Sequence, residues 1–451
     1  MQTQSELNIL EKNSVFSLLL KYSIPAVIGT TASSLYNIID RIIISHGVGP
    51  LAISGLALTL PLMSLSVAFG TLVGVGSSAI ISIRLGEKKK EEALNILGNA
   101  LILNIIIGLL YTVFGLLFLD EILYLFGATE NTISYARDFM QIILAANLIT
   151  QVFFGLNDIL RSSGYPQKAM FIMLMTVAIN VILAPVFIFV FHWGIRGAAL
   201  ATVVAQLIGM IFVLIHFINP THSVFFSKKC FKLNVHIIKD IFSIGMAPFI
   251  LHISASLVAM FMNMQLGTYG GDMAIGAFGI INSVNMLFAM IVVGLNQGMQ
   301  PIVGYNYGAK NYSSVIKTCK YGALVATVIT TIGFLCTRYF PHLIAMAFTK
   351  DADLLSMSVI GLRITFVTYM IVGFQMVSSN FFQSIGKAKI SIFLSLSRQV
   401  LFLIPALYFL PPFFQLKGVW YASPTSDIIS FILTFIVVFY QYKKLKEASF
   451  T

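Results

Sequence analysis

Three carboxylates lie inside long apolar stretches of this 451-residue chain: Asp40, Asp158 and Asp427. A charge at the centre of a bilayer costs about 2.5–3.5 kcal/mol on insertion scales, so such residues mark functional positions by default. Ser33, Asn37 and Asp40 recur at i, i+4 and i+7 and share one helix face. Tyr36 lies beside this stripe. We expect Asp40 to carry a proton, although an end-of-span ion pair with Arg41 would also explain it.

A second acid occupies the apolar segment 132–160. Asn147, Gln151 and Asp158 lie on one face of this segment by the same helical spacing. Asp158 is a candidate for proton or substrate transfer, and Gln151 for the same site. An ion pair with Arg161, three residues later, is the simpler structural explanation.

The third acid, Asp427, lies close to the C-terminal end of the chain. It follows Thr425 and Ser426 and has Gln206 as its counterpart in the repeat described below. Asp427 and Gln206 are therefore candidates for gating or for contact with a cationic substrate.

The elements that must position these residues are membrane spans. Hydrophobic residues make up 58% of the chain and charged residues only 10%, whereas soluble domains carry about 25% charged residues. A spanning helix needs about 20 mostly apolar residues. Twelve segments meet this requirement, roughly 15–45, 51–83, 93–119, 132–160, 169–191, 197–218, 237–267, 273–305, 313–338, 354–384, 388–410 and 417–441. The chain is predicted to be an all-α integral membrane protein.

The net charge of +11 comes from Lys and Arg in alternate loops. With the N-terminus in the cytoplasm, twenty of the 28 basic residues fall in inside regions, four in outside loops and four within or at the ends of spans. This is the positive-inside pattern, and it predicts that both termini are cytoplasmic. The basic excess therefore sets orientation and does not indicate nucleic-acid binding. The three cysteines show neither metal-ligand spacing nor a disulfide framework.

The chain repeats itself at an offset of 222 residues. Residues 46–57 match 268–279, Gly164 falls on Gly386, and the offset becomes 221 where 197–202 match 418–423. Six spans per repeat return the chain to the same side, so the two halves are related by an axis along the membrane normal. The predicted domains are an N lobe at 1–218, a cytoplasmic loop at 219–236 and a C lobe at 237–451. No phosphate-binding loop motif is present, which favours a transporter driven by an ion gradient.

Three segments of the sequence carry a family resemblance: the first span ends LYNIIDRIIISHGVGPLAISGLAL, NDILRSSGYPQKA follows span four, and GAALATVVAQ opens span six. In their order and spacing these segments resemble the multidrug and toxic compound extrusion (MATE) family. The segment KGVWYASPTSD is similar to the DinF-like bacterial branch. The resemblance implies two six-helix lobes arranged as a V in a bacterial cytoplasmic membrane. It also implies a monomeric, cofactor-free antiporter that exports amphipathic organic cations in exchange for H⁺ or Na⁺.

The resemblance further implies a site in the N lobe. An acid at the place of Asp40 binds the coupling proton, with Asn37 and Tyr36 on the same span. Asn180 in span five matches the family's amide, and Thr202 in span six matches its hydroxyl, although both would also serve as ordinary interhelical hydrogen-bonding groups.

Two departures from the family's patterns bear on the coupling ion. The family commonly has an Asp one turn after the amide, where this chain has Ala184. Spans seven and ten carry no carboxylate in their interiors. Because Na⁺ requires several oxygen ligands, including carboxylates, H⁺ is favoured over Na⁺, although loss of the acid could equally weaken coupling.

Three other functions fit the sequence less well. A flippase for lipid-linked oligosaccharides has the same fold but would need an arginine-rich cavity, and Arg363 and Arg398 are the main basic residues within spans. An intramembrane enzyme would need a His, Ser or metal site at bilayer depth. A channel would need a ring of like residues around a pore. The 19 Met and 38 Phe residues suit a cleft that accepts varied cations.

Overall fold

The computed structural model describes residues 14–227 and 229–448; seven side chains within these ranges are also left out, namely Asn37, Ile38, Ser45, Pro50, Leu51, Ile53 and Asp272. Within this part of the chain every regular element is a helix. Ten helices are long and apolar enough to cross a membrane, and two bent pairs bring the total to twelve. The predicted all-helical, multi-pass fold is confirmed.

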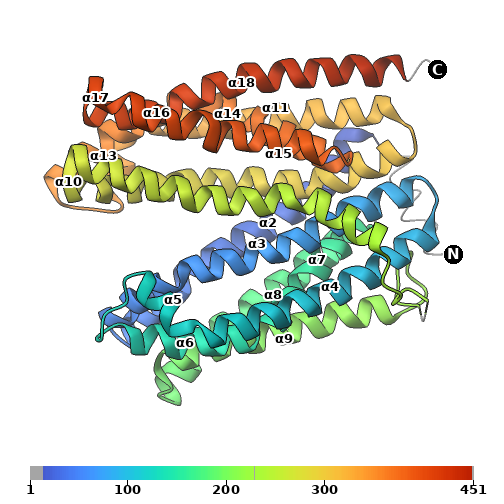
Figure 1. Ribbon diagram of the computed structural model, residues 1–451, viewed down its shortest axis with the longest axis horizontal. Helices are drawn as coiled ribbons and strands as arrows, with labels where there is room; N and C mark the ends of the chain where they lie inside the picture. Colours follow the sequence, from blue (N-terminus) through green and yellow to red (C-terminus); the bar gives the residue numbers. More distant parts are fainter. Residues whose placement is uncertain (1–13, 228, 449–451) are drawn as a thin grey trace. The chain divides into compact units, whose positions relative to one another are not determined.

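The first half of the chain forms these helices: α2 (Val15–Gly47), α3 (Pro50–Gly86), α4 (Lys90–Leu117), α5 (Leu119–Leu125), α6 (Ile133–Ala145), α7 (Asn147–Ser162), α8 (Pro166–Pro185), the π-helical turn η1 (Val186–Val190) and α9 (Gly194–Ile218). Pro residues at the first turns of α3 and α8 suit positions where no intrahelical N–H bond is required. The loops at 86–90 and 219–234 lie at the end opposite α5 (Figure 1).

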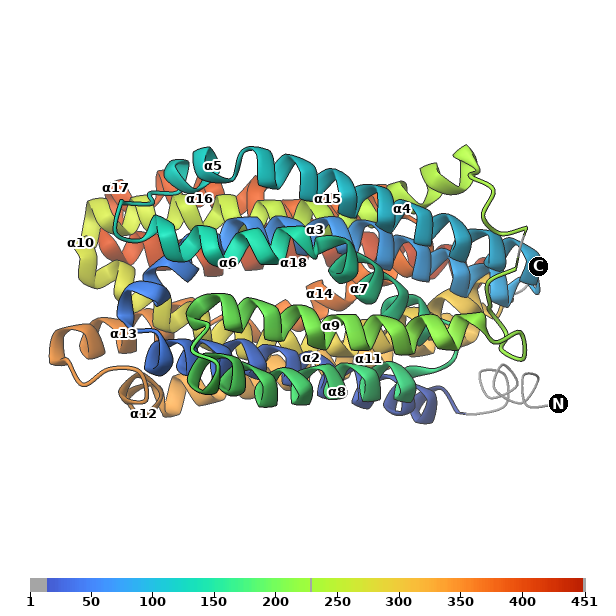
Figure 2. The same ribbon diagram turned by 90° about the horizontal axis from the view of Figure 1, so that it is seen from below.

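The second half forms these helices: α10 (Val235–Gly308), α11 (Tyr312–Tyr339), α12 (Pro341–Met346), α13 (Ala352–Thr365), α14 (Tyr369–Ser384), α15 (Ala388–Leu396), the π-helical turn η2 (Ser397–Phe402), α16 (Leu403–Phe409), α17 (Pro411–Phe414) and α18 (Leu416–Glu447). Helix α10 contains two spans, divided at Gly271 (φ 66°). This turn, α13 and α17 lie at one end of their unit (Figures 1 and 2).

The contacts divide the described chain into two compact units. Unit 1 comprises residues 28–249, and unit 2 comprises residues 14–27 together with 250–448. The first half of α2 therefore belongs to unit 2, and the first part of α10 belongs to unit 1. The sequence repeat had placed these boundaries at 218 and 237, because a repeat records the order of spans and not their packing.

The duplication is visible in the backbone. Left-handed residues recur at the offset of 222: Gly49 with Gly271, Lys88 with Lys310, and Gly164 with Gly386; Gly194 and Gln415 are 221 apart. A positive φ is uncommon outside glycine, so four coincident pairs indicate one ancestral set of turns. The same loop geometry has been kept in both halves.

The fourth span of each half is broken. Helices α6 and α7 meet at 56°, and α13 and α14 meet at 57°. A break frees backbone carbonyls that no water can satisfy at bilayer depth. Thr112 of α4 donates to the carbonyl of Leu144 at 2.6 Å, so a hydroxyl from the third span stabilises the bend in unit 1. In unit 2 the Thr330 hydroxyl of α11 lies 3.2 Å from the Met370 carbonyl and 3.0 Å from the Ala326 carbonyl of its own helix.

Close helix packing in unit 2 depends on glycine. Gly373 of α14 lies against the backbone of α11, where a Cβ would come within 2.6 Å of the Ala326 carbonyl carbon. Gly279 of α10, by contrast, has nothing within 4 Å of the same position. Small residues allow such approach between membrane helices.

We therefore expect Gly373→Ala to destabilise the protein by about 1–3 kcal/mol, the usual cost of overpacking. Thermal unfolding of purified protein measures this, with Gly279→Ala as the matched control that shares the gain in helix propensity. Equal unfolding temperatures for the two variants would contradict the tight α11–α14 contact.

Candidate functional site

A hydrogen-bonded network joins three helices inside unit 1. The Tyr36 hydroxyl of α2 lies 2.8 Å from Thr202 Oγ1 of α9. The Asn180 amide of α8 donates to both, at 3.2 Å and 3.0 Å. The Ala198 carbonyl lies 3.2 Å from the Thr202 hydroxyl as a second acceptor. Three of the residues expected in the N-lobe site are therefore in direct contact.

Asp40 lies one helical turn after Tyr36 on α2. Its side chain is 8% exposed, and its Oδ1 has no hydrogen-bond partner among the described residues. No ion pair joins it to Arg41 in the described part of the chain, and Arg41 is exposed. Arg41 is thus a neighbouring charge that does not contact the carboxylate, and Asp40 is a buried acid with no ion-pair partner among the described residues. The Asn37 side chain lies outside the described residues.

Two acceptor oxygens of this region are left open. Besides Asp40 Oδ1, the Asn180 Oδ1 atom is buried without a partner among the described residues. Ala184, one turn after Asn180, is fully buried, so a methyl group occupies the place where the resemblance implied a carboxylate. The region can accept a proton or a small cation, with Asp40 as its one carboxylate among the site residues of α2, α8 and α9.

Asp158 is paired within its own helix. Its Oδ1 lies 3.3 Å from Arg161 Nη1 on α7, and both side chains are largely buried. Its other oxygen lies against α3, where a Cβ on Gly74 would be 3.0 Å away. The simpler explanation offered by the sequence is what the structure shows.

The amides near Asp158 bind helices together. Gln151 Nε2 donates to the carbonyl and hydroxyl of Ser66 on α3, at 2.8 Å and 3.2 Å. Gln206 of α9 accepts a 2.5 Å hydrogen bond from Thr150. These contacts join α3, α7 and α9, and none of them reaches Asp40.

Asp427 is the centre of a buried cluster in unit 2. Arg398 Nε donates to its Oδ1 at 2.9 Å, and Thr368 Oγ1 donates to its Oδ2 at 3.1 Å. Gln375 donates to its backbone carbonyl at 2.6 Å, and Ser426 donates to the Arg398 carbonyl. Asp427 is 5% exposed, so its charge is balanced by Arg398 inside the unit.

The pairing of Arg398 with Asp427 was not predicted from the sequence. Arg398 lies in the π-helical turn η2, a feature frequent at functional sites. One feature of the sequence could have indicated this pair: Arg398 and Asp427 are the mid-span charges of the last two apolar segments. The repeat places Asp427 opposite Gln206 of unit 1, which also accepts from a threonine, but Thr150 and Thr368 are not repeat counterparts.

Metal-ligand chemistry has no candidate among the described residues. No group of three or more His, Cys, Asp and Glu side chains lies close enough to hold a metal ion. The three cysteines are free.

Comparisons with known proteins agree with this architecture. The MatE family model matches residues 25–186 and 248–409, once in each half. The multidrug export protein MepA of Staphylococcus haemolyticus is 28% identical over 428 residues, covering 95% of this chain and 94% of that protein. A solved outward-facing structure of a multidrug resistance MATE family transporter is 26% identical, with a TM-score of 0.92 and coverage of 97% and 98%. A MATE structure in the bent conformation is 25% identical, with a TM-score of 0.93 and coverage of 99% of both chains.

The matched segments include the spans that carry Tyr36, Asp40 and Asn180 in unit 1 and Arg398 in unit 2. Sequence, helix order and backbone repeat therefore lead to one assignment. The chain belongs to the MatE family, whose members are multi-pass membrane transporters and not enzymes.

Proposed function

We propose that this protein is a secondary active multidrug efflux antiporter that exports amphipathic organic cations in exchange for protons. The names of its relatives support multidrug export, and the excess of basic residues in alternate loops supports cytoplasmic termini. The single observation that carries the coupling proposal is the buried Asp40 carboxyl, whose Oδ1 has no partner among the described residues.

The chemistry of Asp40 follows from its surroundings. An ionised carboxylate at bilayer depth is costly without a compensating donor, and either a proton or a bound cation relieves that cost. The two ligands therefore compete for one group. In the exchange cycle, ionised Asp40 favours the state that accepts a cation from the cytoplasmic side, and protonation from outside favours its release.

The Tyr36–Thr202–Asn180 network gives this exchange a structural consequence. Ionised Asp40 accepts hydrogen bonds only, whereas protonated Asp40 also donates one. The network next to Asp40 links α2 to α8 and α9 through Tyr36, and Asn180 Oδ1 is an open acceptor in it. We infer that the proton acts on the position of α2 through this network.

Energetics limit what the exchange can use. One proton exchanged for one monovalent cation moves no net charge, so only the pH difference drives it, about 1.4 kcal/mol per unit. A second proton would add about 2.3 kcal/mol per 100 mV of membrane potential.

Sodium coupling is disfavoured by the ligand set. Na⁺ is a hard cation that prefers several oxygen ligands, and Ala184 removes one carboxylate that the resemblance implied. Asn180 already donates to Tyr36 and Thr202 and leaves only its carbonyl oxygen for a cation.

The alternative function is a flippase for lipid-linked substrates, and it depends on whether Arg398 is free to bind a phosphate. Binding a diphosphate would require an arginine whose charge is free. Arg398 Nε donates to Asp427 at 2.9 Å. The other mid-span arginine, Arg363, is exposed and belongs to a different helix, α13. The ion pair in unit 2 is therefore better explained as internal charge balance.

The first prediction concerns Asp40. In proteoliposomes with an imposed pH gradient, Asp40→Asn should lower ethidium transport at least about tenfold, the rate equivalent of 1.4 kcal/mol, because the amide cannot exchange a proton. The matched control is Asp353→Asn, an exposed acid on α13, which should transport normally. Undiminished proton-driven transport by Asp40→Asn would refute the coupling role.

The second prediction concerns the ion. With the pH equal on both sides, an imposed Na⁺ gradient should leave ethidium transport at the level seen with K⁺, because the site lacks the oxygen ligands for Na⁺. Robust transport driven by Na⁺ alone would overturn proton coupling. Measuring both gradients on the same vesicle preparation controls for protein orientation.

The third prediction concerns the ion pair of unit 2. Arg398→Met should destabilise the protein by about 3–5 kcal/mol near neutral pH, because it leaves the Asp427 charge buried alone. The deficit should shrink as the pH falls, since protonation removes that charge. The double variant Arg398→Met, Asp427→Leu should unfold close to the native temperature; if both variants matched the native chain, the buried pair would carry no structural role.

A further inference from the structure

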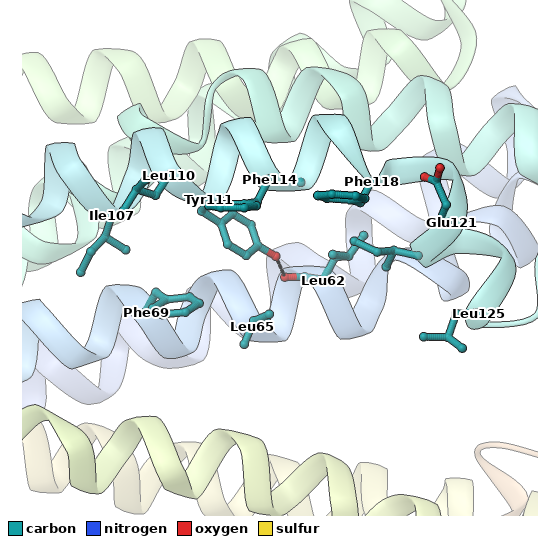
Figure 3. A pocket seen from close by; sticks show the side chains of 12 residues that line it. Leu62, Leu65, Phe69, Ile107, Leu110, Tyr111, Phe114, Phe118, Glu121 and Leu125 are labelled. Atoms are coloured by element: carbon teal, nitrogen blue, oxygen red, sulfur yellow. Dashed lines mark hydrogen bonds between the residues drawn. The ribbon is translucent and has the colours of Figure 1, made fainter.

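An elongated apolar groove runs along one side of unit 1. It lies between α3 and the α4–α5 segment and has a volume of about 690 Å³. Figure 3 shows Ile107 at one end, Glu121 near the other, and the rings of Tyr111, Phe114 and Phe118 between them. A cavity of this size is within the range that holds drug-sized ligands.

The helix spacing explains why the aromatic row faces the groove. Ile107, Tyr111, Phe114 and Phe118 recur at intervals of three or four residues and share one face. Gly115, four residues after Tyr111, also lines the groove and packs against α6, where a Cβ would be 2.7 Å from Leu144. This glycine allows α4 to approach α6, and the aromatic row beside it faces the groove.

The floor of the groove is held in place by a single hydroxyl. Tyr111 donates to the carbonyl of Leu62 on α3 at 2.6 Å, and its ring lies 5.9 Å from that of Phe69. The phenol is therefore satisfied and presents only its ring to the groove. Phe114 and Phe118 are 59% and 49% exposed, so their faces are open to a ligand.

Glu121 lies at one end of the groove, whose walls are otherwise apolar. The neighbouring acids are neutralised: Asp120 pairs with Arg137 and Asp138 with Arg196, each at 2.7 Å. Glu121 takes part in no ion pair among the described residues. An uncompensated carboxylate therefore lies at the end of a row of aromatic faces, and both features attract cations.

We propose that this groove is a peripheral binding site for amphipathic organic monocations, with Glu121 contacting the charge and the aromatic row contacting the apolar body. It is separate from the Asp40 region and rests on the proposed function only for the class of ligand. In the predicted orientation α5 lies outside, so the site receives cations at the outer membrane surface. The carboxylate disfavours the phosphate of a phospholipid headgroup, which is why we assign the groove to a cation.

The test uses the full-length protein in nanodiscs whose phospholipids carry brominated chains. A Phe118→Trp reporter, read against the parent chain with its two tryptophans, should be quenched by those chains. Tetraphenylphosphonium should displace them and restore fluorescence. Tetraphenylborate, which has the same shape and the opposite charge, should do so only at higher concentration. Phe114→Trp provides a second reporter if the first folds poorly.

Glu121→Gln in the reporter background should weaken tetraphenylphosphonium binding about fivefold, or about 1 kcal/mol at 1.4 kcal/mol per tenfold. The matched control is Glu130→Gln, which changes an exposed acid outside the groove and should leave the affinity unchanged. If the two ions displace lipid equally, or if Glu121→Gln has no effect, the groove holds acyl chains and the proposal is overturned.

Binding is measured without transport, so the two proposals fail separately. Asp40→Asn should keep the Glu121-dependent fluorescence response. A native chain that binds tetraphenylphosphonium in the groove but exports no cation would refute the proposed function and leave the site standing. If the chain exports cations but the reporter fluorescence responds equally to tetraphenylphosphonium and tetraphenylborate, the groove site alone is refuted.

Discussion

Inside the hydrocarbon of a bilayer a polar group must find its partner within the protein, because no water is available there. The structure meets this constraint repeatedly. Thr112 donates to a carbonyl beside the broken span of unit 1, and Arg398 neutralises Asp427. Several buried polar atoms of the described residues keep no partner, and Asp40 Oδ1 is the one carboxyl oxygen among them. A carboxyl in that position is stable only with a proton or a cation, and this is the basis of the proposed exchange.

The two halves of the chain share a backbone but differ in their polar content. The left-handed turns and the bent fourth spans are common to both. The repeat counterparts Gln206 and Asp427 differ, however: Gln206 is a neutral amide that accepts from Thr150, whereas Asp427 is paired with Arg398. Asp158 and Asp427 are thus balanced by arginines within their units, and Asp40 lies beside a neutral network. Duplication supplied the shared scaffold, and the polar side chains then diverged.

Much of this could be predicted from the sequence, for physical reasons that also explain what was missed. Helix periodicity and the repeat reveal local patterns, so the spans and the Tyr36 stripe were visible. The bends were missed because hydropathy is continuous across Ala146, and the hydroxyl that stabilises the break comes from another helix. Arg398 was missed because it meets Asp427 only after η2 and α18 pack together. Contact of Asn180 with Thr202 was anticipated only through family resemblance.

In the proposed exchange, a proton and a substrate cation compete for Asp40. The most direct measurement is the pH change on adding tetraphenylphosphonium to purified protein in weakly buffered detergent, near the pH at which the Asp40 carboxyl is half protonated. We expect the native chain to release protons in proportion to the cation bound, and Asp40→Asn to bind the cation without release. Proton release that persists in Asp40→Asn, or native binding without any release, would show that the two ligands do not compete for this carboxyl.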